Sequence, residues 1–106
     1  MLRIVEVENG IVQGLPAADP RITSFKGIPF AAPPVGDNRW RAPQPAQNWD
    51  GVLKAFEFAP ISMQPRPGAD PAQLYDREWH VDPNIPMDED CLYLNIWTPA
   101  KSPDEK

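Results

Sequence analysis

Few side chains in this sequence of 106 residues could carry out chemistry, and they do not form a catalytic set. His80 is the only histidine, and a catalytic triad or a zinc site needs partner residues that the chain lacks. We therefore interpret His80 as a surface or interface residue. Cys91 is the only cysteine. It has no basic neighbour to favour the thiolate and it begins an apolar run, so we expect an inert, buried thiol.

Three consecutive acids, Asp88, Glu89 and Asp90, precede that cysteine. A calcium loop would need a different spacing of oxygen ligands and a glycine, and both are missing. The sequence also contains no G-x-S-x-G nucleophile elbow and no glycine-rich oxyanion loop. We therefore expect no metal, no cofactor and no catalysis from this chain by itself.

The main element after the acids is a strand. Leu92, Leu94 and Ile96 fall on one face at a period of two, and Tyr93, Asn95 and Trp97 fall on the other. Both faces are largely apolar, which predicts a strand covered on both sides in a large sheet. Since little sequence follows it, we expect the neighbouring strands to come from a partner chain or from a missing part of a larger protein.

Fifteen prolines dominate the rest of the composition, roughly 14% against a typical 5%. They exclude long helices and long central strands over most of the chain. Four Trp, four Phe and two Tyr are too many large anchors for a disordered linker. The composition therefore predicts an ordered, irregular polypeptide packed on a larger body. An autonomous Pro/Trp-rich binding module is the alternative that composition leaves open.

Two shorter patterns predict local structure. Alternation from residue 2 onward, with Asn9-Gly10 as a type I′ turn signal, predicts a three-stranded antiparallel meander over residues 2–28. Asp70 followed by Pro71 resembles a helix start with an N-cap acid, and Pro83 limits that helix to about three turns. Tyr75 and Trp79 would then share one face of the helix.

Charge and hydropathy exclude two classes of partner. A net charge of -5, with no basic patch, argues against nucleic acid. No apolar run approaches the roughly 20 residues of a membrane span, so we expect no membrane partner. The single cysteine allows no disulfide within the chain, and no signal peptide is visible. These features predict a cytoplasmic protein.

The order of several motifs resembles the carboxylesterase type B family, which includes cholinesterases and bacterial para-nitrobenzyl esterases. The run from Glu89 to Asn95 is similar to the family's second signature. Four further stretches resemble the family's N-terminal region and occur in the same order: residues 25–31, 33–36, 39–45 and 49–52. The resemblance covers residues 9–99 and implies an α/β-hydrolase fold and a serine hydrolase of small carboxylic esters, acting through an acyl-enzyme.

The resemblance also implies what lies elsewhere. In the family the oxyanion loop follows the strand that begins at Cys91, and the serine, acid and histidine come later still. Residues 1–106 would then be the N-terminal part of one α/β-hydrolase domain, completed by a second chain or a missing segment that carries the triad. A nick or gene split near residues 101–106 is the expected boundary. A non-catalytic, cholinesterase-like adhesion protein is the alternative.

Four residues acquire expected roles from the resemblance. In secreted relatives the cysteine at position 91 pairs with an upstream cysteine, whose place is taken here by Ser62, which agrees with a cytoplasmic esterase. Trp79 lies near a tryptophan that binds substrate in cholinesterases, although its spacing to Cys91 differs. Arg39 and Glu89 match two residues that are typically paired, so we expect a structural ion pair, buried and held by two parallel hydrogen bonds.

Overall fold

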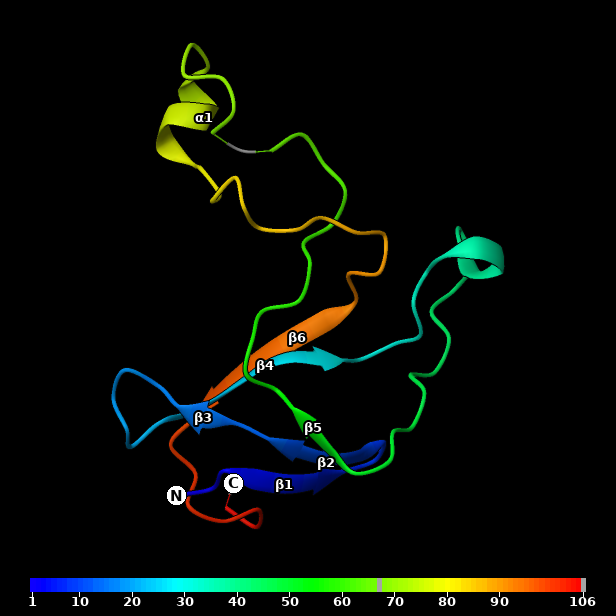
Figure 1. Cartoon of the computed structure of the whole chain (residues 1–106), viewed down its shortest axis with the longest axis vertical. Coiled ribbons are helices and arrows are strands. Elements are labelled where there is room, and N and C mark those ends of the chain that lie inside the picture. The colour runs from blue at the N-terminus through cyan, green and yellow to red at the C-terminus, as the bar shows by residue number, and fades with distance from the viewer. Residues whose placement is uncertain (67, 106) are drawn as a thin grey trace.

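The computed structural model describes residues 1–66 and 68–105, so Lys106, the last residue of the charged tail, lies outside the described residues. Two three-stranded sheets form the body of the molecule, and a long segment containing α1 stands away from them (Figure 1). No helix among the described residues is long and apolar enough to cross a membrane. The small mixed and antiparallel sheets are consistent with part of an α/β fold.

The first sheet has the order β1-β2-β5. Strands β1 (Ile4–Val7) and β2 (Gly10–Gln13) form the expected antiparallel hairpin, and β5 (Val52–Lys54) pairs with β2 in parallel. The turn residues are Glu8 and Asn9 rather than Asn9-Gly10. Among the described residues Trp40 is the only non-glycine with positive φ, so the expected type I′ turn is wrong.

The second sheet overturns the predicted meander. Strand β3 (Leu15–Pro16) pairs with β4 (Thr23–Pro29), and β4 pairs with β6 (Tyr93–Thr98), both antiparallel. The chain crosses between sheets at Gly14, where an added Cβ would lie 2.6 Å from the carbonyl oxygen of Ser24. Strand β4 thus lies between β3 and β6, and its longer pairing is with the distant segment Tyr93–Thr98.

Residues 55 and 56 join the two sheets. The amide of Ala55 donates to the carbonyl of Gln13 at 2.8 Å, and the amide of Lys26 donates to the carbonyl of Ala55 at 2.9 Å. Val12, Phe25 and Ala55 form the small buried core between the sheets. Thr23 is buried beside them, and its hydroxyl donates to the carbonyl of Leu2 at 2.7 Å, so this buried polar group is satisfied.

A bulge in β4 is built around Gly27. The register of β4 against β6 shifts between Phe25 and Ile28. Gly27 has a φ of +74°, and its amide donates to the side-chain oxygen of Asn95 at 3.0 Å. The side chain of Asn95 thus replaces a main-chain acceptor where the ladder is interrupted.

Strand β6 lies at the edge of its sheet, and the expectation that further chain covers both its faces stays a prediction. Among the strands that the structure describes, β4 alone pairs with it, and the side chains of Leu94, Ile96 and Trp97 are exposed. The apolar character of both faces was visible in the sequence, but the described residues supply a partner on one edge only.

Two further elements differ from expectation. Helix α1 (Leu74–Glu78) begins four residues after Asp70, with Gln73 at its N-cap. The carboxylate of Asp70 instead accepts the amide of Ala72 at 3.0 Å, and its carbonyl accepts the amide of Gln73 at 3.0 Å, so these residues form a turn. The proline-rich stretch contains a short 3₁₀ helix, η1 (Gly36–Asn38).

Candidate functional site

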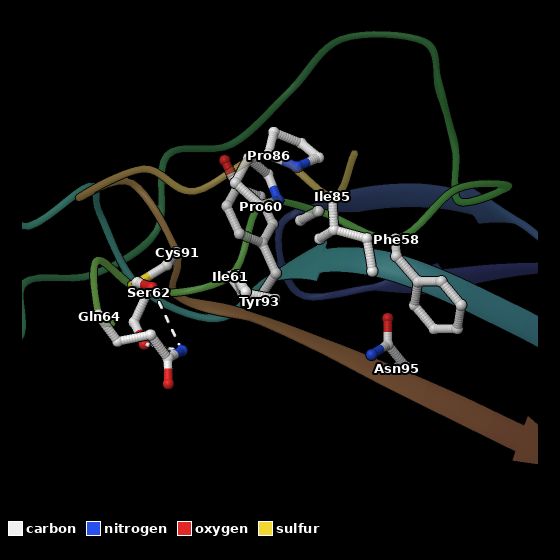
Figure 2. A pocket seen from close by; sticks show the side chains of 11 residues that line it. Phe58, Pro60, Ile61, Ser62, Gln64, Ile85, Pro86, Cys91, Tyr93 and Asn95 are labelled. Carbon is white, nitrogen blue, oxygen red and sulfur yellow. Dashed lines mark hydrogen bonds between the residues drawn. The ribbon is translucent and has the colours of Figure 1, made fainter. Parts of the chain in front are cut away.

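A hollow lies where three segments of the chain meet. It has a volume of about 530 Å³, and the side chains around it are mainly apolar (Figure 2). The lining residues are Phe58, Ala59, Pro60, Ile61, Ser62, Gln64, Ile85, Pro86, Cys91, Tyr93 and Asn95. Volume and lining are typical of a site for a small, mostly apolar molecule.

Tyr93 contributes the phenol of this pocket from the start of β6. Its hydroxyl donates a hydrogen bond to Oδ2 of Asp90 at 3.0 Å. Burial raises the pKa of Tyr93, and the hydrogen bond to Asp90 and the nearby negative charges raise it further. The phenol therefore stays protonated at neutral pH, where it is a hydrogen-bond donor and not a base.

Ser62 and Cys91 lie together at one end of the pocket (Figure 2). The side-chain amide of Gln64 donates to the hydroxyl of Ser62 at 3.2 Å and to its carbonyl at 3.3 Å. Cys91 is half-buried rather than fully buried, and it is a free thiol. Ser62, the residue expected at the place of an upstream cysteine, thus lines the same pocket as Cys91.

Ile85 and Pro86 in the pocket wall belong to a long loop, residues 61–87, whose two ends lie side by side. The amide of Ile61 donates to the carbonyl of Pro86, and the amide of Asp88 donates to the carbonyl of Ile61, both at 3.0 Å. These bonds form a parallel bridge between Ile61 and Met87. Residues 61–87 are therefore closed at their base by main-chain pairing, and α1 lies at the far end (Figure 1).

Trp79 follows α1 and lies outside the pocket lining. Its amide donates to the carbonyl of Tyr75 at 2.8 Å, and the residue is 67% exposed. Tyr75 is also exposed, so the two side chains are not packed in a core. The substrate-binding role expected of Trp79 stays a prediction. His80 is exposed as well.

Arg39 and Glu89 lie within ion-pair distance. Nε of Arg39 is 3.2 Å from Oε1 of Glu89, and the two side chains are 60% and 43% exposed. The expected burial and the two parallel hydrogen bonds are therefore not what the described residues show. Arg39 also lies over the ring of Trp40, with 5.8 Å between the guanidinium carbon and the ring centroid.

Two contacts at the site were not anticipated. The alternation of the sequence places Tyr93 on a face of the strand but does not predict a partner for its hydroxyl. Strand β6 begins at Tyr93, and the hydroxyl bonds to Asp90, three residues earlier in the chain. Arg66 donates to two main-chain carbonyls, those of Asp82 and Ile85. No sequence signal marks Arg66, because its acceptors are main-chain atoms brought close by the path of the loop.

The side chains around the pocket are mostly apolar, with a few hydroxyl, thiol and amide groups among them. In the part of the chain that the structure describes, no hydrogen bond joins a hydroxyl or thiol to His80, and no three His, Cys, Asp or Glu side chains cluster as a metal site would require. The geometry thus offers an apolar pocket with a few polar groups.

Comparison with known proteins gives one family. The model of the carboxylesterase family matches residues 2–106. Similar proteins include an acetylcholinesterase from Bungarus fasciatus, 41% identical over 93% of this chain. A phenmedipham hydrolase from Pseudarthrobacter oxydans is 50% identical over 71% of this chain, and a cholinesterase from Mus musculus is 37% identical over 94%. The chain spans only 16%, 14% and 17% of the lengths of these three proteins.

Proposed function

The chain belongs to the carboxylesterase family, and from that premise we propose that it is the N-terminal part of an α/β-hydrolase domain that hydrolyses small carboxylic esters. The observation that carries this proposal is the family match over residues 2–106, together with relatives named as cholinesterases and as a hydrolase. A second chain, or a segment beyond these residues, completes the domain and supplies the serine, acid and histidine.

In the proposed reaction the serine oxygen attacks the ester carbonyl while the histidine takes the serine proton. The tetrahedral intermediate collapses and the alcohol leaves with that proton. Water, deprotonated by the same histidine, then attacks the acyl-enzyme and releases the acid and the free serine. None of these groups is assigned to residues 1–106, which would contribute binding surface and support.

We propose that Trp79 contributes to the substrate site of the complete protein. Its exposed ring, on a segment that also supplies the pocket residues Ile85 and Pro86, supports this assignment. An exposed tryptophan is costly to leave in water, and a flat aromatic surface binds both apolar groups and cations.

We also propose a cytoplasmic location. The support is chemical: the chain has one cysteine, and the residue brought beside it is Ser62. A reducing compartment offers no advantage to a disulfide at this place. Fractionation of cells that express the complete protein, with activity recovered outside the cytosol, would contradict this assignment.

The test of the main proposal is hydrolysis of a short-chain nitrophenyl ester by the complete protein and by pure residues 1–106. We expect turnover by the complete protein and none by the shorter chain. Turnover by residues 1–106, with no second chain detectable by intact mass, would overturn the proposal that the catalytic groups lie outside these residues. A complete protein that binds its partners but turns over no ester would favour the adhesion alternative.

A further inference from the structure

The segment 61–87 is closed by contacts between its two limbs. The first is the main-chain bridge between Ile61 and Met87. A second lies further out, at Gly68, whose φ is +92° and where an added Cβ would be only 2.4 Å from Cβ of His80. The limbs therefore run close together from the base of the segment to a point just below α1.

Arg66 lies between these two contacts and spans the limbs with its side chain. Nη1 donates to the carbonyl of Asp82 at 3.1 Å and to the carbonyl of Ile85 at 2.9 Å. One nitrogen carries two hydrogens, so a single guanidinium group can supply both bonds. The side chain is half-buried, which limits competition from water.

The acceptors of Arg66 belong to a turn that is already closed. The amide of Ile85 donates to the carbonyl of Asp82 at 3.0 Å, and the amide of Asn84 donates to the carboxylate of Asp82 at 2.8 Å. Arg66 therefore holds a preformed turn in place rather than creating it. Among the described residues its charge forms no ion pair with a carboxylate, so both bonds go to main-chain oxygens.

This turn forms part of the pocket wall. Ile85, whose carbonyl accepts from Arg66, lines the pocket, and so does Pro86, whose carbonyl accepts from Ile61. The same turn lies on the return limb, after Trp79 and His80. Loss of the Arg66 bonds would leave the main-chain bridge between Ile61 and Met87 to hold the two limbs at their base, so the Ile85 side of the wall and the outer part of the segment would be held less firmly.

We propose that Arg66 is a positioning residue: a non-covalent clasp that closes the neck of residues 66–85 and fixes the Ile85–Pro86 wall of the pocket. The effect on ester hydrolysis rests on the proposed function, whereas the effect on the loop does not. The two hydrogen bonds from the charged guanidinium of Arg66 oppose separation of the two limbs of the segment.

Trypsin cleavage after Arg77 in the complete protein measures that opening. Trypsin does not cut before proline, so replacing Arg66 leaves the number of tryptic sites unchanged, since Pro67 follows it. We expect Arg66→Met to be cut after Arg77 about tenfold or more faster than the parent, because the open population rises when charged hydrogen bonds are lost. Arg66→Lys, which keeps the charge and three donors, should return most of the protection.

Arg41→Met is the control for loss of charge, because it removes a positive charge from an exposed arginine whose side-chain bond to Asn38 is 3.3 Å long. It also removes the tryptic site before Ala42, so the comparison uses only the rate at which the bond after Arg77 is cut. Arg41→Met should leave cleavage after Arg77 unchanged. Circular dichroism checks that each variant folds, and Arg66→Gln, with a shorter donor, replaces Arg66→Met if the latter does not. Equal cleavage in the parent and the folded variants, or a lysine variant as sensitive as the methionine variant, would overturn the clasp.

The second readout is the separation of KM from kcat for nitrophenyl esters. We expect Arg66→Met to raise KM about fivefold or more with a smaller change in kcat, since a displaced wall weakens binding rather than bond breaking. Faster cleavage without any change in KM would limit Arg66 to the loop and contradict its role at the pocket. Faster cleavage in a protein that hydrolyses no ester would retain the clasp and refute the proposed function instead.

Discussion

Nε of Arg39 lies 3.2 Å from Oε1 of Glu89, so the proline-rich stretch after β4 is tied to the acidic residues that precede β6. The same guanidinium lies over the ring of Trp40, which is 93% exposed and has a φ of +64°. A bulky residue with positive φ is strained and needs surrounding contacts to hold it. Arg39 is the neighbour that contacts both the carboxylate and this ring.

The ion pair predicts a stability effect that depends on context. In residues 1–106 the pair is half-exposed, and Glu89→Gln should cost under about 1 kcal/mol. If further chain covers the pair in the complete protein, the same change should cost roughly 3–5 kcal/mol there, because it would leave a buried guanidinium without its partner. Thermal melts of both forms measure this. A complete Glu89→Gln protein that melts at the parent temperature would contradict a buried pair.

Gly27 and Gly51 provide a matched pair for the bulge in β4. Both have positive φ, +74° and +72°. A Cβ at Gly27 would lie 2.7 Å from the carbonyl oxygen of Glu57, whereas nothing lies within 4 Å of one at Gly51. Gly51→Ala should cost about 1–2 kcal/mol from the backbone conformation alone. Gly27→Ala should cost more, since main-chain atoms must also move. Equal losses in denaturant midpoint would show that the close contact relaxes freely.

The phenol of Tyr93 predicts a dependence of stability on high pH. Burial and the hydrogen bond to Asp90 raise its pKa in the folded chain. The folded state then holds the proton that the unfolded state releases above pH about 10, so stability falls as pH rises through that range. Below it the contribution is fully present. Tyr93→Phe should therefore lose less stability than the parent between neutral and alkaline pH. Parallel stability curves for the two proteins would refute this.

Trp79 should affect specificity more than stability. Its side chain is 67% exposed, so Trp79→Ala should change the free energy of unfolding by within about 0.5 kcal/mol in residues 1–106. If the ring contacts substrate in the complete protein, the ratio of rates between bulky and small esters should shift by roughly tenfold or more. Tyr75→Ala, one helical turn away and equally exposed, is the control. Unchanged relative rates across a panel of esters would assign Trp79 to packing.

The sequence anticipated the elements whose partners are local or whose motifs are shared with the family. The hairpin of β1 and β2, the strand at β6, and the approach of Arg39 to Glu89 are of this kind. The pairing of β4 with β6 was missed because alternation predicts a strand but does not name its neighbour. The start of α1 was missed because Asp70 can cap either a helix or a turn, and its carboxylate accepts from Ala72 in the turn. Arg66 could not be found, since main-chain acceptors leave no mark in a sequence.

The most direct test of the account is labelling of the complete protein with a fluorophosphonate, followed by mass spectrometry of its peptides. Such a reagent modifies a serine only where a base and an oxyanion site activate it. We predict that one serine outside residues 1–106 is labelled, with loss of nitrophenyl ester turnover in proportion to labelling. Labelling of a serine within residues 1–106 would contradict the proposal that the nucleophile lies outside them. No labelled serine, in a protein that turns over no ester, would contradict the proposed serine hydrolase itself.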